Sequence, residues 1–216
     1  MQAIIFDMDG VIIDSEPVHQ RLEIEMLEEL GGSISTDEYL KFVGTTDEYM
    51  WSHFKEMYNL EPSVEELIAT KKKKFMEEIH EVPLVDHFMT VLDAFYDKGY
   101  RLALASSNNR KTVDHIVDQF SLGEYFEVTM SGEDITHGKP HPEIFLKTAE
   151  ELNVEPTECL VFEDAANGVE AAKKAEMKCV ALDNPNSGVQ DLSQADVILD
   201  DFEHFDVDQL LAELNE

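Results

Sequence analysis

Basic side chains are scarce in this chain of 216 residues. Only 16 lysines and arginines stand against 47 aspartates and glutamates, which gives a formal net charge of −31. So acidic a surface repels nucleic-acid backbones and anionic lipid headgroups, and we therefore expect neither nucleic acid nor a membrane as a partner. A small anionic ligand would meet the same repulsion, so its binding site would need a divalent cation, a lysine or helix N-termini.

Cysteine is nearly absent, and long apolar runs are missing. Cys159 and Cys179 each open a short apolar segment, which predicts two reduced thiols packed in a core. No apolar run approaches the about 20 residues needed to span a bilayer, and no basic flank precedes the first strand-like segment. These absences favour a cytoplasmic protein. We expect a monomer, although no feature of the sequence determines the oligomeric state.

The opening stretch of the chain organises the rest. Residues 3–6 are apolar and strand-favouring, and the run then breaks off into Asp7, Asp9 and Gly10. In open α/β sheets, ligands bind beyond the carboxyl ends of the strands, so acids placed there face a site. Asp7 and Asp9 project from the same side of an extended chain, and their repulsion requires a cation, a shared proton or a ligand. Taken alone, these residues also fit a strand end followed by an ordinary turn.

Only helices are predicted from residue 15 to about residue 80. Ser15 and Pro17 are typical of a helix start. Helical patterns then cover residues 18–30, 37–43, 47–58 and 63–79, and the last of these includes four successive lysines at 71–74. We interpret the lysine run as a solvated helix face, with attraction of phosphate as the alternative.

After residue 80 the pattern alternates between strands and helices. Strands are predicted at 101–105, 126–130, 160–162, 178–182 and 197–199. Helices are predicted around them, at 88–96, 111–120, 143–152, 165–174 and 208–214. This alternation indicates an α/β fold with a doubly wound, mostly parallel sheet and a Rossmann-like core. We expect the core to comprise residues 1–14 and 81–216 and to carry an all-α insertion at 15–80.

Polar side chains follow three further strand ends. Ser106 follows the second predicted strand, and Lys139 lies between a glycine and a proline in the loop after the third. Glu163 and Asp164 follow the fourth strand. Each has an ordinary explanation on its own, such as a helix cap or an exposed loop lysine. Because they stand at successive strand ends of one sheet, the set together predicts a shared site in which hydroxyl and backbone N–H groups can hold phosphate oxygens.

These four segments together resemble the motifs of the haloacid dehalogenase superfamily. They are Asp7-Met8-Asp9-Gly10-Val11, Ser106, Gly138-Lys139-Pro140 and Glu163-Asp164-Ala165-Ala166-Asn167-Gly168, in that order. The resemblance covers nearly the whole chain and is to the β-phosphoglucomutase and sugar-phosphatase branch, whose helical cap domain the insertion at 15–80 resembles. It implies an enzyme that acts on a small phosphorylated metabolite.

The resemblance also implies a role for each motif residue. Asp7 would be the nucleophile that forms an aspartyl-phosphate, and Asp9 would be general acid and then general base. The transferring phosphoryl group would be bound by the second and third motifs, through Ser106, Ser107, Asn108 and Lys139. Mg2+ is the implied cofactor, with ligands from Asp7, Asp9, Glu163 and Asp164. The chemistry agrees, since a carboxylate is a competent nucleophile and hard oxygen ligands suit Mg2+.

Hydrolysis and phosphoryl mutation would use the same core residues, so the choice between them depends on weaker positions. The resemblance implies that a mutase has an arginine soon after the glycine at Gly44, whereas this chain has Asp47 there. The resemblance also implies that a mutase has a lysine just after the second motif. This chain lacks that lysine and has Arg110 shortly after the motif. Both departures favour a phosphatase, although Arg110 or a lysine of 71–74 could compensate. The cap residues that could contact substrate are His19, Gly44, Thr45, Thr46, Asp47, Trp51 and Lys74.

Two other classes of protein are alternatives. A signalling receiver domain also gathers acids, Mg2+, a hydroxyl and a lysine at one sheet edge, but it is a single compact domain without a helical insertion. A receiver would take up phosphoryl groups stoichiometrically, whereas an enzyme would release phosphate repeatedly. The second alternative is a family member that has lost activity and serves as a binding protein.

Overall fold

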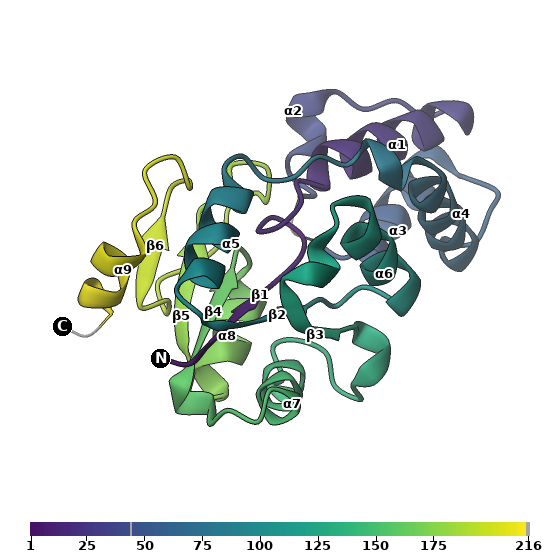
Figure 1. Ribbon diagram of the computed structural model, residues 1–216. Helices are drawn as coiled ribbons and strands as arrows, with labels where there is room; N and C mark the ends of the chain where they lie inside the picture. The colour runs from purple at the N-terminus through teal and green to yellow at the C-terminus, as the bar shows by residue number, and fades with distance from the viewer. Residues whose placement is uncertain (44, 215–216) are drawn as a thin grey trace. The chain divides into compact units, whose positions relative to one another are not determined.

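The computed structural model describes residues 1–43 and 45–214, and its internal contacts divide the chain into two units (Figure 1). The core unit comprises Met1–Asp14, Leu84–Asn184 and the chain from Gln190 onward. The helical unit comprises Ser15–Pro83 together with Pro185–Val189. The sequence pattern did not predict that this second, short segment would group with the helices.

Within the described residues, the core unit is built on a six-stranded sheet of parallel strands in the order β3-β2-β1-β4-β5-β6. The strands are β1 (Ala3–Phe6), β2 (Arg101–Ala105), β3 (Phe126–Met130), β4 (Cys159–Glu163), β5 (Lys178–Leu182) and β6 (Val197–Leu199). The chain builds the sheet outward from β1 in one direction and from β4 in the other. The predicted doubly wound parallel sheet is therefore confirmed, with its switch point between β1 and β4.

Helices cover both faces of this sheet. Successive residues of a strand point to opposite sides, so each strand contributes side chains to an apolar layer on either face. Ile5 lies in the buried cluster that the sheet forms with α7 (Glu143–Glu151) and α8 (Ala166–Lys174). Phe6 points to the other face, where its ring lies 5.5 and 6.3 Å from two rings of α5 (Phe88–Asp97). The core unit also contains α6 (Arg110–Gln119) and α9 (Val207–Glu213).

The helical unit contains α1 (Glu16–Glu29), α2 (Thr36–Tyr39), α3 (Asp47–Tyr58) and α4 (Val64–Glu78). Side-chain caps fix where α3 and α4 begin. Thr46 accepts from an N–H of the first turn of α3, and Ser63 forms a capping box with Glu66 at the start of α4. Trp51 and Phe54 are buried in the apolar cluster that these helices share.

Three features differ from the sequence prediction. The helix expected at 37–43 is only the short α2, because the chain turns through hydrogen bonds from Phe42 N–H to Tyr39 and from Thr45 N–H to Phe42. The lysine run is not a uniform solvated face, since Lys71 is buried. Short 3-10 turns were not predicted and occur at Ile79–Glu81, Leu122–Glu124, Gly132–Asp134 and Pro156–Glu158.

The structure also describes the two cysteines and the longer helices of the chain. Both Cys159 and Cys179 are free and buried, as expected for core thiols. Among the described residues, we find no helix with the length and apolar character that crossing a bilayer requires.

Candidate active site

The predicted acids lie at the switch point of the sheet. Asp7 follows β1, while Glu163 and Asp164 stand at the end of β4. The two strands pair in parallel with Phe6 opposite Phe162, and Asp7 N–H extends the pairing with a 2.9 Å hydrogen bond to the Phe162 carbonyl. Ligands of open α/β sheets bind at this place, beyond the carboxyl ends of the strands.

Lys139 joins two of these carboxylates. Its Nζ donates hydrogen bonds to Asp7 and to Glu163 Oε1, the latter at 2.6 Å, and lies 5.0 Å from the centre of the Phe145 ring. Burial alone would lower the pKa of Lys139, but the charges of Asp7 and Glu163 outweigh it and hold this pKa above its ordinary value. The site therefore contains a fixed ammonium charge next to the proposed nucleophile.

The Glu163 side chain is held on both of its oxygens. While Oε1 accepts from Lys139, Oε2 accepts from the backbone N–H groups of Asp164 at 3.0 Å and Ala165 at 3.1 Å. A β-carbon at Gly168 would overlap the carboxylate, so the glycine in the first turn of α8 provides the space that Glu163 fills. This arrangement fixes Glu163 where it can orient the Lys139 ammonium group.

Asp9 is linked to the second motif through Asn108. The Asn108 side-chain amide donates to Asp9 Oδ2 and, at 3.2 Å, to the Ser106 hydroxyl oxygen. Asn108 N–H donates to the same hydroxyl oxygen at 3.1 Å, and Ser106 is fully buried. Ser107 is exposed in this loop. The structure thus brings Asp9, Ser106 and Asn108 together.

An excess of negative charge makes this edge of the sheet a candidate metal site. Asp7, Glu163 and Asp164 are buried, and one carboxylate oxygen from each lies within 4.8 Å of the others. Burial raises the pKa of Asp7 most; Lys139 opposes this, and Glu163, Asp164 and Asp9 raise it further. Lys139 pairs with two of these four carboxylates, Asp7 and Glu163, so the remaining negative charge favours binding of a cation, and a set of hard oxygen donors fits Mg2+.

Arg110 is occupied within the core unit. Its guanidinium group donates to Asp134, to the Thr129 carbonyl oxygen at 3.0 Å and to the Thr129 hydroxyl at 3.1 Å. Arg110 is the residue that could compensate for the missing mutase lysine. Because these contacts tie it to β3 and the turn that follows, we do not retain it as a phosphate ligand.

The helical unit contains a polar pocket of its own, with a volume of about 180 Å³. At the pocket, Lys71 Nζ lies 2.6 Å from Glu23 Oε1 and 2.7 Å from Asp47 Oδ1, and Tyr39 donates its hydroxyl proton to Glu23. Two carboxylates therefore neutralise the lysine. The lining residues are Glu16, His19, Glu23, Tyr39, Phe42, Thr45, Thr46, Asp47, Met50 and Lys71.

The other predicted cap residues lie elsewhere or are not described. Trp51 is fully buried in the apolar cluster of the helical unit, so it supports the fold of this unit and does not line the pocket. Lys74 pairs with Glu29 at 2.9 Å. Gly44 lies outside the described residues. Of the seven cap candidates, the pocket brings together His19, Thr45, Thr46 and Asp47.

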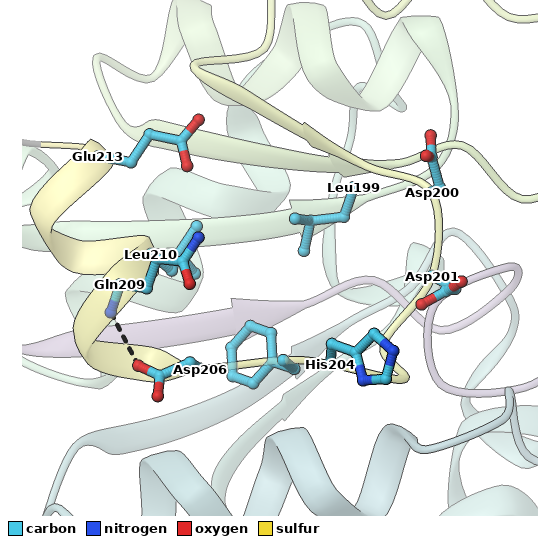
Figure 2. Close-up of a pocket in the computed structure, with 9 residues that line it drawn as sticks. Leu199, Asp200, Asp201, His204, Asp206, Gln209, Leu210 and Glu213 are labelled. Carbon is cyan, nitrogen blue, oxygen red and sulfur yellow. Dashed lines mark hydrogen bonds between the residues drawn. The ribbon is translucent and has the colours of Figure 1, made fainter.

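A larger hollow of about 320 Å³ lies near the C-terminal end of the core unit, and Figure 2 shows the residues around it. Its lining includes four acids and three apolar residues, namely Asp200, Asp201, Asp206 and Glu213 with Leu199, Phe205 and Leu210. Asp206 Oδ1 accepts from Gln209 N–H at 2.8 Å, which caps α9. None of the predicted site residues lines this hollow, so we do not assign the reaction to it.

Sequence reasoning missed Glu23, and it named Gly168 only as the last residue of the fourth motif, without a role for it. Glu23 stands on the face of α1 that also buries Leu22, Met26 and Leu27, and an acid at such a position signals a buried partner. Gly168 lies in the first turn of a helix, and glycine is a poor helix former, costing about 1 kcal/mol relative to alanine in a helix interior. Both signals were present in the sequence. However, neither one shows which residue pairs with Glu23 or which side chain fills the space beside Gly168.

Comparison with known proteins places the chain in a family. A family model described as haloacid dehalogenase-like hydrolase matches residues 4–182. The phosphorylated carbohydrates phosphatase of Thermotoga maritima is 34% identical over 179 residues, which cover 81% of this chain and 82% of that protein. Hexitol phosphatase B of Escherichia coli strain K12 is 30% identical over 190 residues, which cover 86% of this chain and 85% of that protein.

Solved structures agree with the family model. The crystal structure of CbbY from Rhodobacter sphaeroides in complex with phosphate matches with a TM-score of 0.80 and 26% identity, and the match covers 100% of both chains. The family match spans well over half of this chain, and the motif residues lie at the switch point of the sheet. The predicted family and the predicted enzyme class are confirmed, and the chain belongs to the haloacid dehalogenase-like hydrolases.

Proposed function

We propose that this protein is a Mg2+-dependent phosphatase that hydrolyses small sugar or polyol phosphate monoesters through an aspartyl-phosphate on Asp7. The observation that carries the proposal is the buried contact of Asp7 with Lys139, next to Asp164 at the switch point of the sheet. Lys139 fixes the orientation of the Asp7 carboxylate and supplies positive charge for the oxygens of an arriving phosphoryl group.

The chemistry then takes two steps. An Asp7 oxygen attacks phosphorus, the bond from phosphorus to the ester oxygen breaks, and the Asp9 carboxyl group gives its proton to the leaving alcohol. Water next attacks phosphorus and gives a proton to Asp9, and the bond between Asp7 and phosphorus breaks. Asn108 holds Asp9 in place for both proton transfers, and Ser106 in turn positions the Asn108 amide.

The donor set fits the implied cofactor. Asp7 and Asp164 would hold Mg2+ with their side chains, and the main chain of Asp9 would contribute as the family resemblance implies. Glu163 would help mainly by balancing charge, since its oxygens already bind Lys139 and backbone N–H groups. When bound, Mg2+ would neutralise negative charge on the transferring phosphoryl group.

Two observations support a phosphatase of carbohydrate monophosphates over a mutase. Relatives that cover most of this chain are named a phosphorylated carbohydrates phosphatase and a hexitol phosphatase. A mutase needs a cation for the second phosphate of its bisphosphate intermediate. Lys71 is the lysine that lines the described pocket of the helical unit, and Glu23 and Asp47 neutralise it. We also propose that residues 15–80 act as the cap, and that the protein is a cytoplasmic monomer.

Phosphate release and product analysis test this proposal. Purified enzyme is screened with hexose phosphates, hexitol phosphates, phosphoglycolate, nucleotides and pyrophosphate, with Mg2+ and then with a chelator. We expect repeated turnover on carbohydrate monophosphates, and inorganic phosphate as the main product of any accepted glucose phosphate. Interconversion of glucose 1-phosphate and glucose 6-phosphate with little phosphate released would instead identify a mutase. Stoichiometric phosphorylation without turnover would identify a receiver, and inactivity on every ester would support a binding protein.

A further inference from the structure

Two histidines and a glutamate lie close together just before and at the start of α7, apart from the acidic site. His137 and His141 belong to the loop that precedes the helix, and Glu143 is its first residue. The two imidazole rings have centroids 4.7 Å apart and are inclined by 34°. One nitrogen from each ring and one Glu143 oxygen all lie within 4.8 Å of one another. Both histidines are exposed, so solutes can reach the cluster.

The Glu143 carboxylate is already oriented by its surroundings. It accepts hydrogen bonds from the N–H groups of Thr136 and His137, both at 2.9 Å, and Lys147 Nζ lies 3.0 Å from its Oε1. The hydrogen bond from Thr136 contributes most to a pKa of about 2 for Glu143, so the group is an anion at neutral pH. An ionised carboxylate that is held in place can serve as a metal ligand with little reorganisation.

The spacing of the donor atoms suits a bound ion. His137 Nδ1 lies 2.9 Å from Glu143 Oε2. Two neighbouring ligands that each lie about 2.0 to 2.2 Å from a metal are separated by roughly 2.9 to 3.5 Å. An ion can therefore replace the proton that His137 and Glu143 share. His141 Nδ1 accepts a 3.2 Å hydrogen bond from Glu143 N–H, so this ring nitrogen carries a lone pair, as a metal ligand must.

We propose that His137, His141 and Glu143 form a binding site for a first-row transition ion such as Zn2+ or Co2+. Imidazole donors favour these ions, whereas Mg2+ prefers oxygen ligands such as those of the acidic site. The two histidines flank Lys139 in the chain, so a bound ion restrains the segment that carries this lysine. The proposal does not depend on the proposed phosphatase activity.

Titration of tag-free protein with Co2+ in excess Mg2+ tests the site, because Mg2+ occupies the oxygen-rich site and Co2+ reports imidazole ligands by its visible absorption. We expect one Co2+ per chain, a visible spectrum typical of nitrogen ligation, and a higher thermal unfolding temperature. His137→Ala and His141→Ala should each weaken Co2+ binding about tenfold or more.

His115→Ala is the matched control, since His115 is partly exposed in the same unit and contacts Gln119. It should bind Co2+ as the wild type does. Circular dichroism checks that each variant is folded, and Glu143→Gln, which keeps an acceptor oxygen, provides a second variant of the site. Wild-type protein that binds no Co2+ in excess Mg2+ would overturn the proposal. Equal affinity in folded His137→Ala and His141→Ala, or loss of binding only in Asp164→Ala, would do the same.

Discussion

A β-carbon at Gly168 would lie 1.7 Å from Glu163 Oε1, so the Glu163 carboxylate fills the space that this glycine leaves. Gly168→Ala should displace Glu163 and with it the Lys139 ammonium group that Glu163 orients. A misplacement of about 1 Å near a reacting centre can cost roughly 100-fold in rate, and we expect a loss of kcat of this order. Steady-state phosphate release by folded variant protein measures it.

Gly123→Ala is the control for this substitution. A β-carbon there would make only an ordinary contact, 3.6 Å from Val117 Cγ1, and Gly123 belongs to the 3-10 turn Leu122–Glu124, outside the four motifs. Its kcat should equal that of the wild type. Equal activity of Gly168→Ala and Gly123→Ala would show that Lys139 does not need Glu163 at this position.

Lys71 should matter for the stability of the helical unit. Lys71→Met leaves the buried Glu23 carboxylate without its cation, and breaking a buried pair in this way costs about 3 to 5 kcal/mol. Lys73→Met, in the same helix, removes an exposed lysine whose Nζ lies 3.8 Å from Glu77 Oε1. It should change the free energy of unfolding by less than about 1 kcal/mol. Urea unfolding followed by circular dichroism compares the two, and similar midpoints would contradict the assigned role of Lys71.

The pH dependence of the free energy of unfolding should reflect the protonation of His19. Burial, and then the charge of Lys71, lower the pKa of His19 to about 3, whereas the unfolded chain has a histidine pKa of about 6.5. The unfolded state therefore binds the proton first, and stability falls as the pH decreases from about 6.5 towards 3. His19→Gln should reduce this acid-dependent loss. NMR titration gives a direct check, because a His19 resonance with a midpoint near pH 6.5 would rule out the assigned environment.

Much of the fold and of the core site could be predicted because local patterns determine them. The strands at 101–105, 126–130 and 178–182 have the observed bounds, since short apolar runs between turn residues are unambiguous. Asp7 and Lys139 are 132 residues apart, yet both follow parallel strands, and parallel strands bring their carboxyl ends to one edge.

The pairing of Lys71 with Glu23 and Asp47 could not be predicted in the same way. The three residues lie on different helices, and which side chains meet depends on how those helices pack. Four successive lysines are usually solvated, and only the packing shows that the first of them is buried. The same limit applies to Trp51, whose ring packs in the apolar cluster and not in the pocket.

Activity should depend on a divalent cation and on Asp164. Asp164→Ala removes one oxygen donor from the cluster with Asp7 and Glu163, so it should lower both the affinity for Mg2+ and kcat. Ca2+ should inhibit the wild type, because its larger and looser coordination sphere misplaces the nucleophile. Phosphate release measured against Mg2+ and Ca2+ concentration tests both statements. Full activity in excess chelator would refute the dependence on metal.

The most direct test of the central claim is the kcat of Asp7→Asn for phosphate release on an accepted carbohydrate phosphate. Asp118→Asn, an exposed aspartate of α6, is the matched control and should keep wild-type activity. If Asp7 is the nucleophile, folded Asp7→Asn should lose at least about 1,000-fold in kcat, which corresponds to about 4 kcal/mol in barrier height. A folded Asp7→Asn that keeps more than about a tenth of wild-type kcat, a barrier change of only about 1.4 kcal/mol, would contradict the mechanism.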